Sequence, residues 1–598
     1  MGLMQKAIET FDAMSYRIGK EYDNEKEPLA PIGHIIAKAQ IEITIDAEGQ
    51  FVSAQSVDKK IVIPVTEESM GRTSAPVAHP LCEQIAFLLP EFPEKHTLYL
   101  DALTEWCRSG YSHVKVNAIL TYIKGGMLRI DLESNNILKW EDGNLKNAKD
   151  LVCWNVIGLG ENSGPVWTDP TVLQAYTGYY LAVHEADGKQ LCMITGECAV
   201  PAKQHLKGVF SLNGNAKIIS ANDKANFTFR GRFLEDSEAT SVGYIASQKA
   251  HNALKWLVTN QGTVFGGRCF VCWNPHGKRM PGQFNPLFIS EEGKKVDPTE
   301  YRQELAKVVE GYKADLPAKE GVIIASFDAA TTGRLAIAYY NELMGSDFID
   351  RLAHWDSTCC WYHTHYGTSA PALFRIVNFA FGTERSDGKV EVDDKVLAQH
   401  MQRLLACRVN QSLFPKDILT ALVTKAGNLQ VYSTANRSTL LFTACACIRK
   451  YYIDVYKEEI DMALDTQRHD RSYQFGRLLA VMEKIEQDTY DKTETRETNA
   501  VRLQSVFVQR PGYAAKIVMD MLKSAYYPRL KPGARVFYDR LIGEIMEQLS
   551  LFEPEEYNKP LTETYLPGYY LQKNALWTKK ESATDNNNTE TEDEEDEI

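Results

Sequence analysis

Two groups of residues in the sequence are of the types that bind metal ions. His469 and Asp470 are adjacent, as in some metal-dependent phosphohydrolases. A second group is interspersed with Trp355 and Trp361, which suggest packing: His354, Cys359, Cys360, His363 and His365. An adjacent His-Asp pair needs further His and Asp ligands to hold a metal, and the second group lacks the spacing of a zinc finger. A metal-dependent nuclease is therefore an alternative function, but we expect no catalytic residue and no bound metal.

Other catalytic patterns are absent or weak. The sequence contains no G-x-x-x-x-G-K-[ST] phosphate loop, no G-x-S-x-G nucleophile elbow and no H-E-x-x-H zinc pair. Cys269 and Cys272 form a lone C-x-x-C, but residues three apart on a strand face opposite sides. Gly158 and Gly160 precede no helix of the kind that binds a dinucleotide. We therefore expect core thiols, loop glycines and no cofactor.

Arginines alternate with aromatic residues between positions 226 and 233. Arg230 and Arg232 lie beside phenylalanines, and the polar Asn222 precedes them. Guanidinium and aromatic groups at short range suit contacts with phosphates and bases. The alternative is an ordinary strand whose arginines face water. We predict that Asn222, Arg230 and Arg232 contact nucleic acid.

The residues that follow, 241–259, have the pattern of a two-faced helix. At 100° per residue, the apolar positions fall within a stripe of about 120°: Val242, Ile245, Ala246, Ala253, Trp256 and Leu257. Gln248, His251 and Lys255 fall on the opposite face, which contains no acid, and Ser241 is placed to cap the helix. Such a face suits phosphate oxygens, so we predict that these three side chains bind nucleic acid.

A basic segment occupies residues 500–542. It has eight basic residues against Asp520 and Asp539, a local net charge of +6: Arg502, Arg510, Lys516, Lys523, Arg529, Lys531, Arg535 and Arg540. A basic band on an acidic protein suits a phosphate backbone, and a solvated helical face is the alternative. Among these residues we predict nucleic-acid contacts for Lys516, Lys523 and Arg535.

The net charge of −13 is concentrated at the C-terminus. Residues 581–598 carry nine acids and no base, so the remainder nets −13 + 9 = −4. This tail has almost no apolar residues, so we expect it to be disordered. The chain has no apolar run long enough to span a membrane and no apolar signal core near its start. Its twelve cysteines are scattered as in reduced proteins. We expect a cytoplasmic protein that does not bind membranes.

The elements that position these residues can be read from periodicity. A helix over 3–19 precedes a hairpin of strands at 41–45 and 51–57, and another strand covers 61–65. The loop Arg72-Thr73-Ser74 follows, before a helix from about Pro80. Arg pairs with guanine edges and hydroxyls donate to phosphate, so we predict that these three residues bind nucleic acid. A helix-capping loop with a buried Arg is the alternative.

Later segments predict strands at 151–157, 191–195, 217–220, 264–273 and 321–327, with helices between them at about 170–185 and 241–259. From about 395 the pattern is helical, apart from a short stretch near Gln430. The predicted fold class is α+β, with mixed α/β N-terminal and middle regions before a helical bundle. We place the domains at 1–150, 151–394 and 395–580, with the bundle from about 462 and the acidic tail from 581.

Several stretches, in preserved order over about residues 5–550, resemble the large subunit of the type I-C CRISPR effector complex. They are Arg72–Ser74 with Ala78–Pro80, Cys192–Glu197 with His205 and Lys207, Phe227–Phe233, Ser247–Leu257, Arg334–Tyr340, Pro415–Asp417 and Phe475–Leu478. The last of these contains Arg477, which we include among the predicted nucleic-acid contacts. The acidic tail is not part of the resemblance.

The resemblance implies a DNA-binding scaffold rather than an enzyme. Its partners would be a guide RNA, target double-stranded DNA, the other subunits of the effector complex and a helicase-nuclease recruited in trans. It would read the short motif beside the target and help to open the duplex there, while the guide reads the sequence.

The resemblance also implies that the same gene yields a separate small helical subunit by internal initiation. Met482 lies inside the helix predicted at 472–487, whereas Met462 lies between two helices. A start at Met462 would keep the bundle whole, so we favour it, although a non-methionine codon could also serve. Several copies of the product would present a basic track suited to a displaced single strand.

Overall fold

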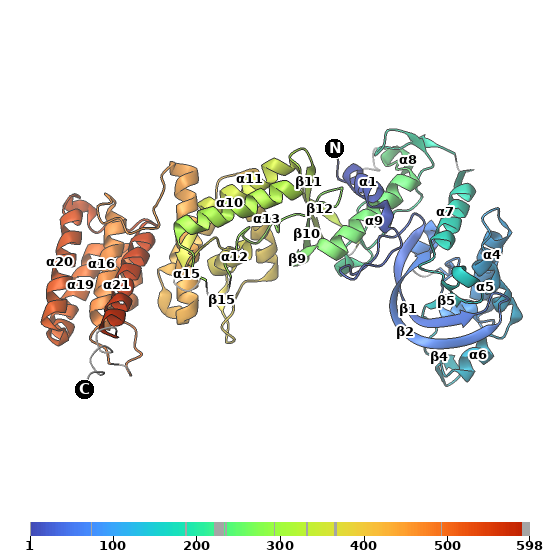
Figure 1. Ribbon diagram of the computed structural model, residues 1–598, viewed down its shortest axis with the longest axis horizontal. Helices are drawn as coiled ribbons and strands as arrows, with labels where there is room; N and C mark the ends of the chain where they lie inside the picture. The colour runs from blue at the N-terminus through green and yellow to red at the C-terminus, as the bar shows by residue number, and fades with distance from the viewer. Residues whose placement is uncertain are drawn as a thin grey trace, which may run out of the picture. The chain divides into compact units, whose positions relative to one another are not determined.

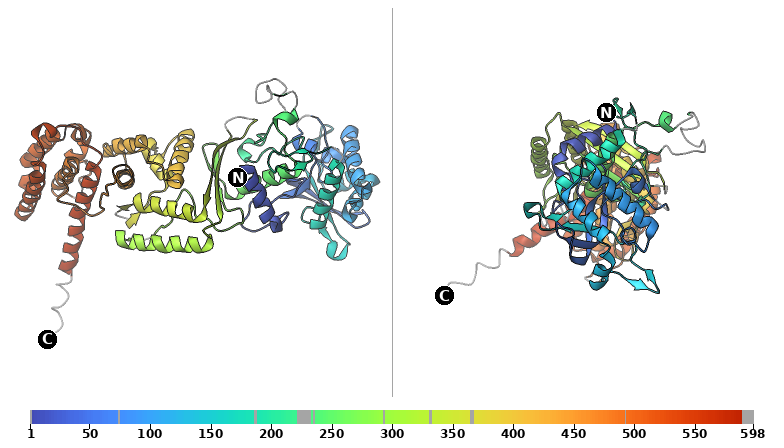
Figure 2. Two further views of the ribbon diagram at one scale, coloured as in Figure 1. Left: turned by 90° about the horizontal axis from the view of Figure 1, so that it is seen from above. Right: turned by 90° about the vertical axis from the view of Figure 1, so that its right-hand side faces the viewer.

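The computed structural model describes residues 2–72, 75–185, 188–220, 233, 236–291, 294–329, 333–363, 367–491 and 493–588, without the side chains of 213, 236, 237 and 577–588. The chain is a mixed α+β protein whose C-terminal region is helical, which confirms the predicted fold class (Figures 1 and 2). It divides into two compact units, residues 1–280 with 320–343, and residues 281–319 with 344–598. These boundaries differ from those expected at 150 and 394. Among the described helices, none is long and apolar enough to cross a bilayer.

The first unit contains a four-stranded sheet in the order β2-β1-β5-β6. β1 (His34–Ile45) and β2 (Phe51–Pro64) form the predicted antiparallel hairpin, with a turn at Gly49, whose φ is +79°. The two strands expected at 51–57 and 61–65 are one continuous strand. β5 (Val152–Val156) pairs with β1 in parallel, so this sheet crosses the boundary expected at residue 150.

Helices cover this sheet: α3 (Ile85–Leu88), α4 (Pro93–Arg108), α5 (Val114–Gly125), α6 (Leu128–Ser134) and α7 (Pro170–His184). The alternating Ile41, Ile43 and Ile45 of β1 point into the core, as the period of two along a strand dictates. Trp106 of α4 packs edge-on against Tyr176 of α7, with ring centroids 5.0 Å apart. The predicted hairpin thus supplies one face of the larger core of this unit.

A second core of the first unit brings together the beginning and the end of its sequence. Its sheet has the order β12-β11-β10-β9, formed by β9 (Thr263–Phe265), β10 (Arg268–Trp273), β11 (Gly321–Asp328) and β12 (Ala336–Met344). Helices α1 (Leu3–Ala13) and α9 (Tyr244–Gln261) pack against each other, and α9 packs on β10. The Trp273 indole donates to Thr10 Oγ1 at 2.9 Å, so the N-terminal helix is tied to this sheet.

Short elements complete the first unit. They are η1 (Ser15–Arg17), α2 (Glu67–Gly71), β3 (Trp140–Glu141), β4 (Asn144–Leu145), η2 (Gly160–Asn162), β6 (Gly164–Pro165), β7 (Gln190–Leu191), β8 (Cys198–Ala199), η4 (Ser211–Asn213) and α8 (Asp236–Ala239). The strand expected at 191–195 is therefore the two-residue β7, and the one expected at 217–220 is reduced to isolated bridges at Lys217.

The second unit begins with a layer of helices and small hairpins. They are α10 (Pro298–Asp315), α11 (Gly345–Thr358), β13 (Trp361–His363), β14 (Gly367–Ser369), α12 (Leu373–Phe381), β15 (Thr383–Glu384), β16 (Val390–Glu391), α13 (Asp394–Asn410), α14 (Lys416–Ala426), η6 (Leu429–Val431), α15 (Thr434–Tyr451) and the π-helical turn η7 (Tyr452–Tyr456). The short strand considered near Gln430 is wrong, because η6 is a single 3₁₀ turn there.

The unit ends in the expected helical bundle. Its elements are α16 (Arg471–Gln487), α17 (Asn499–Arg502), α18 (Gln504–Gln509), α19 (Pro511–Met521), η8 (Leu522–Tyr526), η9 (Tyr527–Arg529), α20 (Pro532–Leu549), η10 (Pro554–Glu556) and α21 (Tyr565–Asn588). α16 lies beside α21 and α20 (Figure 1), and every residue from Ser472 to Glu486 is buried. α21 extends past position 581, and residues 589–598 lie outside the described chain.

Two glycines allow α16 and α21 to approach closely. A Cβ atom added at Gly476 would lie 2.0 Å from the Tyr565 carbonyl oxygen, and one added at Gly568 would lie 2.2 Å from that of Tyr473. Both distances are too short for any side chain, so this crossing requires glycine on each helix. Met482 lies within α16, whereas Met462 precedes it, as the sequence predicted.

Candidate nucleic-acid interface

Helix α9 is covered on most of its circumference, which corrects our interpretation of it as two-faced. Gln248 and His251 are 2% and 0% exposed, so neither faces a bound phosphate. Ile245, expected in the apolar stripe, is 43% exposed. The N-cap is Gly243, while Ser241 donates to the side chain of Gln190 instead. A polar helix face can be buried because its partners come from segments far away in the sequence, which local periodicity does not reveal.

His251 forms part of a buried, neutral pair with His205. The two rings stack with centroids 5.7 Å apart, and Ser247 bridges them, since its Oγ lies 2.8 Å from His205 Nδ1 and 3.3 Å from His251 Nδ1. Burial lowers the pKa of His205 to about 3 and that of His251 to about 4. Neither ring is charged at neutral pH, so both stabilise the fold around α9 rather than attract an anion.

Lysines converge on a hollow of about 580 Å³ beside the C-terminal half of α9. Its charged lining comprises Lys26, Lys60, Lys207 and Lys255 with a single acid, Glu27. We call this feature the lysine hollow. Lys255 is the one predicted contact of α9 that lines it. Among the described residues around it, cations outnumber acids four to one, so the hollow is suited to an anionic ligand.

The electrostatics of the lysine hollow favour a bound anion. Glu27 accepts from Lys60 Nζ at 2.8 Å, which occupies the single carboxylate of the lining. Burial lowers the pKa of Lys255, and the nearby Lys60 lowers it further, while Glu27 acts in the opposite direction. A phosphate oxygen in the hollow would offset both burial and the repulsion between neighbouring ammonium groups.

Two further segments bring cations to the same region. Lys207 forms an antiparallel backbone bridge with Lys217, which forms a parallel bridge with Arg334. Burial lowers the pKa of Lys217, and Lys207 lowers it further. Lys26, Lys60, Lys207, Lys217 and Arg334 line or adjoin the hollow and were not among the residues predicted from the sequence. Lys207 and Arg334 lie in stretches that carry the resemblance, and that signal could have identified them.

The loop expected to read DNA begins beside the lysine hollow. The Arg72 guanidinium pairs with both carboxylate oxygens of the fully buried Glu83 and also donates to the Val77 carbonyl oxygen at 2.6 Å. The Arg72 side chain is 17% exposed, but Glu83 holds its donors, so its role is closer to the alternative interpretation of a structural arginine. Lys207 Nζ lies 3.4 Å from the Arg72 carbonyl oxygen. Thr73 and Ser74, like the predicted contacts Asn222, Arg230 and Arg232, lie outside the described residues.

In the bundle, two of the four predicted contacts have structural roles. Arg477 is buried and donates to Gln572 Oε1 at 3.0 Å, so its prediction as a nucleic-acid contact is wrong in this fold. Arg535 donates to the carbonyl oxygens of Pro528 and Leu530, and so stabilises the turn before α20. Lys516 and Lys523 are exposed, as a contact requires.

The residues of the alternative metal site are used for packing. Asp470 caps α16 by accepting from the Tyr473 amide at 3.1 Å, and His469 stacks on Phe552 with centroids 4.7 Å apart. His363 is buried edge-on against Phe442. His365 lies outside the described residues. In the part of the chain that the structure describes, no three His, Cys, Asp or Glu residues are grouped to hold a metal ion.

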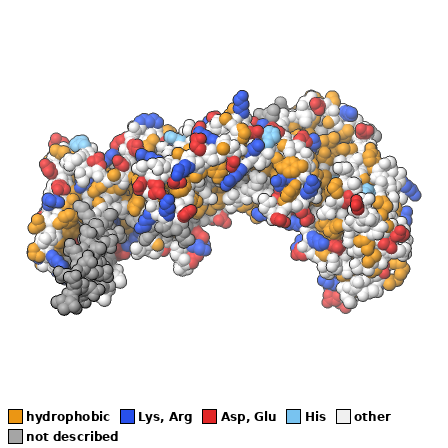
Figure 3. Space-filling view, viewed as in Figure 1, with side chains coloured by type: hydrophobic (Ala, Val, Ile, Leu, Met, Phe, Trp, Pro, Cys, Tyr) orange, Lys and Arg blue, Asp and Glu red, His pale blue; other side chains and the backbone are white. Residues whose placement is uncertain are grey.

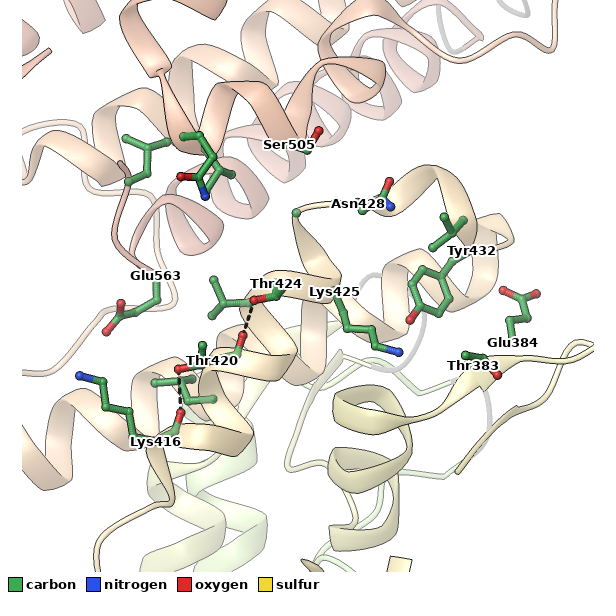
Figure 4. A pocket seen from close by; sticks show the side chains of 17 residues that line it. Thr383, Glu384, Lys416, Thr420, Thr424, Lys425, Asn428, Tyr432, Ser505 and Glu563 are labelled. Atoms are coloured by element: carbon green, nitrogen blue, oxygen red, sulfur yellow. Dashed lines mark hydrogen bonds between the residues drawn. The ribbon is translucent and has the colours of Figure 1, made fainter. Parts of the chain in front are cut away.

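A second hollow, of about 830 Å³, lies along α14 in the other unit (Figure 4). Lys416 and Glu563 lie at one side of it, and Lys425 and Glu384 at the other. The Thr420 and Thr424 hydroxyls donate to carbonyl oxygens one turn earlier, at 2.9 and 2.8 Å. Because cations and acids balance in its charged lining, this hollow is a weaker candidate for an anionic ligand. Acids and bases are also interspersed over the face shown in Figure 3.

The fold and the site define a class: a two-unit α+β protein with a cation-lined hollow and a C-terminal helical bundle. The chain belongs to the family of the CRISPR-associated protein (Cas_Csd1), whose family model matches residues 16–577. That membership supports a place among the subunits of a CRISPR effector complex. No curated protein matches the chain.

Proposed function

We propose that this protein is the large subunit of a type I-C CRISPR surveillance complex and that it binds target double-stranded DNA beside a guide RNA. The observation that carries the proposal is the convergence of lysines on one hollow in a chain of this family. Four ammonium groups with one carboxylate suit the phosphates of a duplex. The protein works with the other subunits of the complex in the cytoplasm.

Motif recognition is assigned to the loop that starts at Arg72. The loop leaves α2 beside Lys207, so a duplex on the lysine hollow would pass close to it. Because the Arg72 guanidinium is paired with Glu83, we assign the base contacts of this loop to Thr73 and Ser74. Replacing both by Ala should reduce discrimination between targets with correct and wrong motifs, while binding of unrelated DNA stays the same.

Strand separation and recruitment of a helicase-nuclease complete the proposed role, and the chain itself performs no catalysis. The alternative, a metal-dependent nuclease, rests on residues that pack or cap a helix. Incubating the purified protein with DNA and Mg²⁺ or Mn²⁺ separates the two functions. Cleavage that is lost in His469→Ala would establish the nuclease and overturn the scaffold proposal.

The lysine hollow is tested by the salt dependence of DNA binding. Lys207→Ala and Lys255→Ala should each weaken binding to all sequences alike and make the slope of log K against log salt shallower by about one unit. Lys249→Ala is the matched control, because Lys249 is also on α9 but is paired with Asp12 at 2.7 Å. Slopes equal to that of the control would show that DNA binds elsewhere.

We also propose that the bundle is made separately as a small subunit. A start at Met462 retains all of α16, whereas a start at Met482 removes its first two-thirds. Intact-mass measurement of complexes expressed from this gene with its partners tests this. The expected product begins at or near residue 462, and its absence would restrict the bundle to the full-length chain.

A further inference from the structure

The lysine hollow has an apolar lining that contact with phosphates alone does not explain. Its apolar residues come from several separate segments of the first unit: Ile35, Met70, Leu206, Phe210, Val258 and Val264. Pockets of about 300–1,000 Å³ that are lined mainly by apolar groups, with a few polar ones, typically enclose a small organic group. The hollow measures about 580 Å³, so its size and lining suit a base as well as a phosphate.

Two hydroxyl groups in the same lining are available to a ligand. Ser211 and Thr259 form no hydrogen bond through their side chains with any other described residue. By contrast, the Thr10 hydroxyl in α1 donates to the Lys6 carbonyl oxygen at 2.8 Å. Because a hydroxyl both donates and accepts, Ser211 and Thr259 can bind the polar edge of any base.

Lys255 is set back from the surface on which a duplex would rest. It is partly buried on α9, one turn before Thr259, and burial lowers its pKa. A B-form duplex, whose major groove alone is about 12 Å wide, is too large to enter a hollow of about 580 Å³. A phosphate reaches Lys255 most directly where the strand bends into the hollow, and there the attached nucleotide leaves the stack.

We propose that the lysine hollow holds one unpaired nucleotide of a bound strand, with its base against Val258 and Val264 and its phosphate on Lys255. The inference rests on the proposed function, in which nucleic acid lies on this hollow. An unpaired base avoids the cost of leaving a stacked pair, so the hollow favours a duplex that is locally open. A DNA strand and a guide RNA offer the same chemistry, and the test compares the two.

The surroundings of the base are measured with 2-aminopurine as the single unpaired nucleotide of a hairpin duplex. When the full-length protein binds, quenching of the 2-aminopurine fluorescence by acrylamide should fall to about a third or less, because such pockets bury about 70–90% of a ligand's surface. The control hairpin carries 2-aminopurine in a base pair. Greater protection in a DNA hairpin assigns the nucleotide to the target, and greater protection in an RNA hairpin assigns it to the guide. If the unpaired base is protected no more than the paired one in either hairpin, the inference is overturned.

Filling the hollow without changing its charge separates the inference from the proposed function. Gly214 lines the hollow with a φ of −59°, and a Cβ atom added there meets no atom within 4 Å. In the parent protein, the hairpin with the unpaired nucleotide should bind about tenfold more tightly than the fully paired one. Gly214→Trp should remove this preference and the protection from acrylamide, while binding of the paired hairpin and its salt slope stay the same.

Val264→Trp fills the hollow from β9 and should act in the same way. Gly110→Trp is the matched control, because an added Cβ atom there is equally free of neighbours and Gly110 does not line the hollow. If both variants in the hollow keep the preference of the parent, the inference is overturned while the proposed function stands. If Lys255→Ala leaves the salt slope of the paired hairpin unchanged, the proposed function fails as well.

Discussion

At the scale of single residues, the pair of Arg72 and Glu83 belongs to the fold although Arg72 has the chemistry of a DNA-reading residue. Glu83 is fully buried and accepts from the His79 and Gln84 amides as well as from Arg72. Arg72→Ala should therefore destabilise the protein by roughly 3–5 kcal/mol, because it leaves a buried carboxylate without its cation. Chemical denaturation followed by fluorescence measures the effect.

The control for that change is Arg129→Ala. Arg129 is 45% exposed in its side chain and pairs with Glu91 at 2.7 Å, so its removal should change stability by less than about 1 kcal/mol. Equal effects of the two substitutions would show that Glu83 does not depend on Arg72. The comparison also matters for DNA binding, because a loss of binding in Arg72→Ala would reflect destabilisation of the fold before any loss of a DNA contact.

Buried histidines make the first unit sensitive to acid. Burial lowers the pKa of His34 and His79 to about 4, as it does for His251, and that of His205 to about 3. Below pH 6.5 the unfolded chain binds protons that the folded chain does not. Stability should therefore fall as the pH drops from about 6.5 to 4, by about 1.4 kcal/mol per pH unit for each such histidine.

His34→Phe isolates one of these histidines. Nε2 of His34 is buried without a hydrogen-bond partner, and the ring packs edge-on against Tyr176, so an aromatic replacement fits its surroundings. The loss of unfolding free energy between pH 7 and pH 5 should shrink by about 2 kcal/mol. A variant with the same pH dependence as the parent would mean that His34 is accessible to protons in the folded protein.

At the scale of elements, the crossing of α16 and α21 depends on glycine. Gly476→Ala places a methyl group 2.0 Å from the Tyr565 carbonyl oxygen, so the helices must separate, at a cost of about 3 kcal/mol or more. Gly543→Ala is the control, because Gly543 lies within α20 with no atom near its added Cβ. The control should stabilise the bundle by about 0.5–1 kcal/mol. Opposite shifts of the thermal midpoint are expected, and shifts of the same sign would contradict the close crossing.

Regular elements followed from the sequence where the residue pattern is local. The alternation of Ile41, Ile43 and Ile45 predicted a strand, and the turn at Gly49 predicted its hairpin. Polar helices were misjudged because their partners are distant. Arg477 donates to Gln572, and Glu483 pairs with Lys573, in each case about ninety residues away. The local sequence of α16 therefore suggests an exposed helix, although the helix is buried. The lysine hollow was missed for the same reason, since only Lys255 lay in a segment that local patterning marked.

At the scale of the whole molecule, the net charge of the chain does not reveal how charge is distributed among its parts. The net charge of −13 coexists with four lysines on one hollow. The acids that give the chain its negative sign are concentrated beyond residue 580. Net charge alone would have excluded a nucleic-acid ligand, whereas its distribution supports one.

The bundle should behave as a separate folding unit with a sharp N-terminal limit. A fragment of residues 462–598 keeps α16 whole, with the Gly476 crossing and the hydrogen bond from Arg477 to Gln572. A fragment of residues 482–598 loses both, together with the buried Phe475 and Leu478. The longer fragment should unfold cooperatively with full helical circular dichroism, while the shorter one should show a broad transition and bind a hydrophobic dye. Equal cooperativity in the two fragments would show that the first turns of α16 are dispensable, and Met482 would then serve as well as Met462 for an independent small subunit.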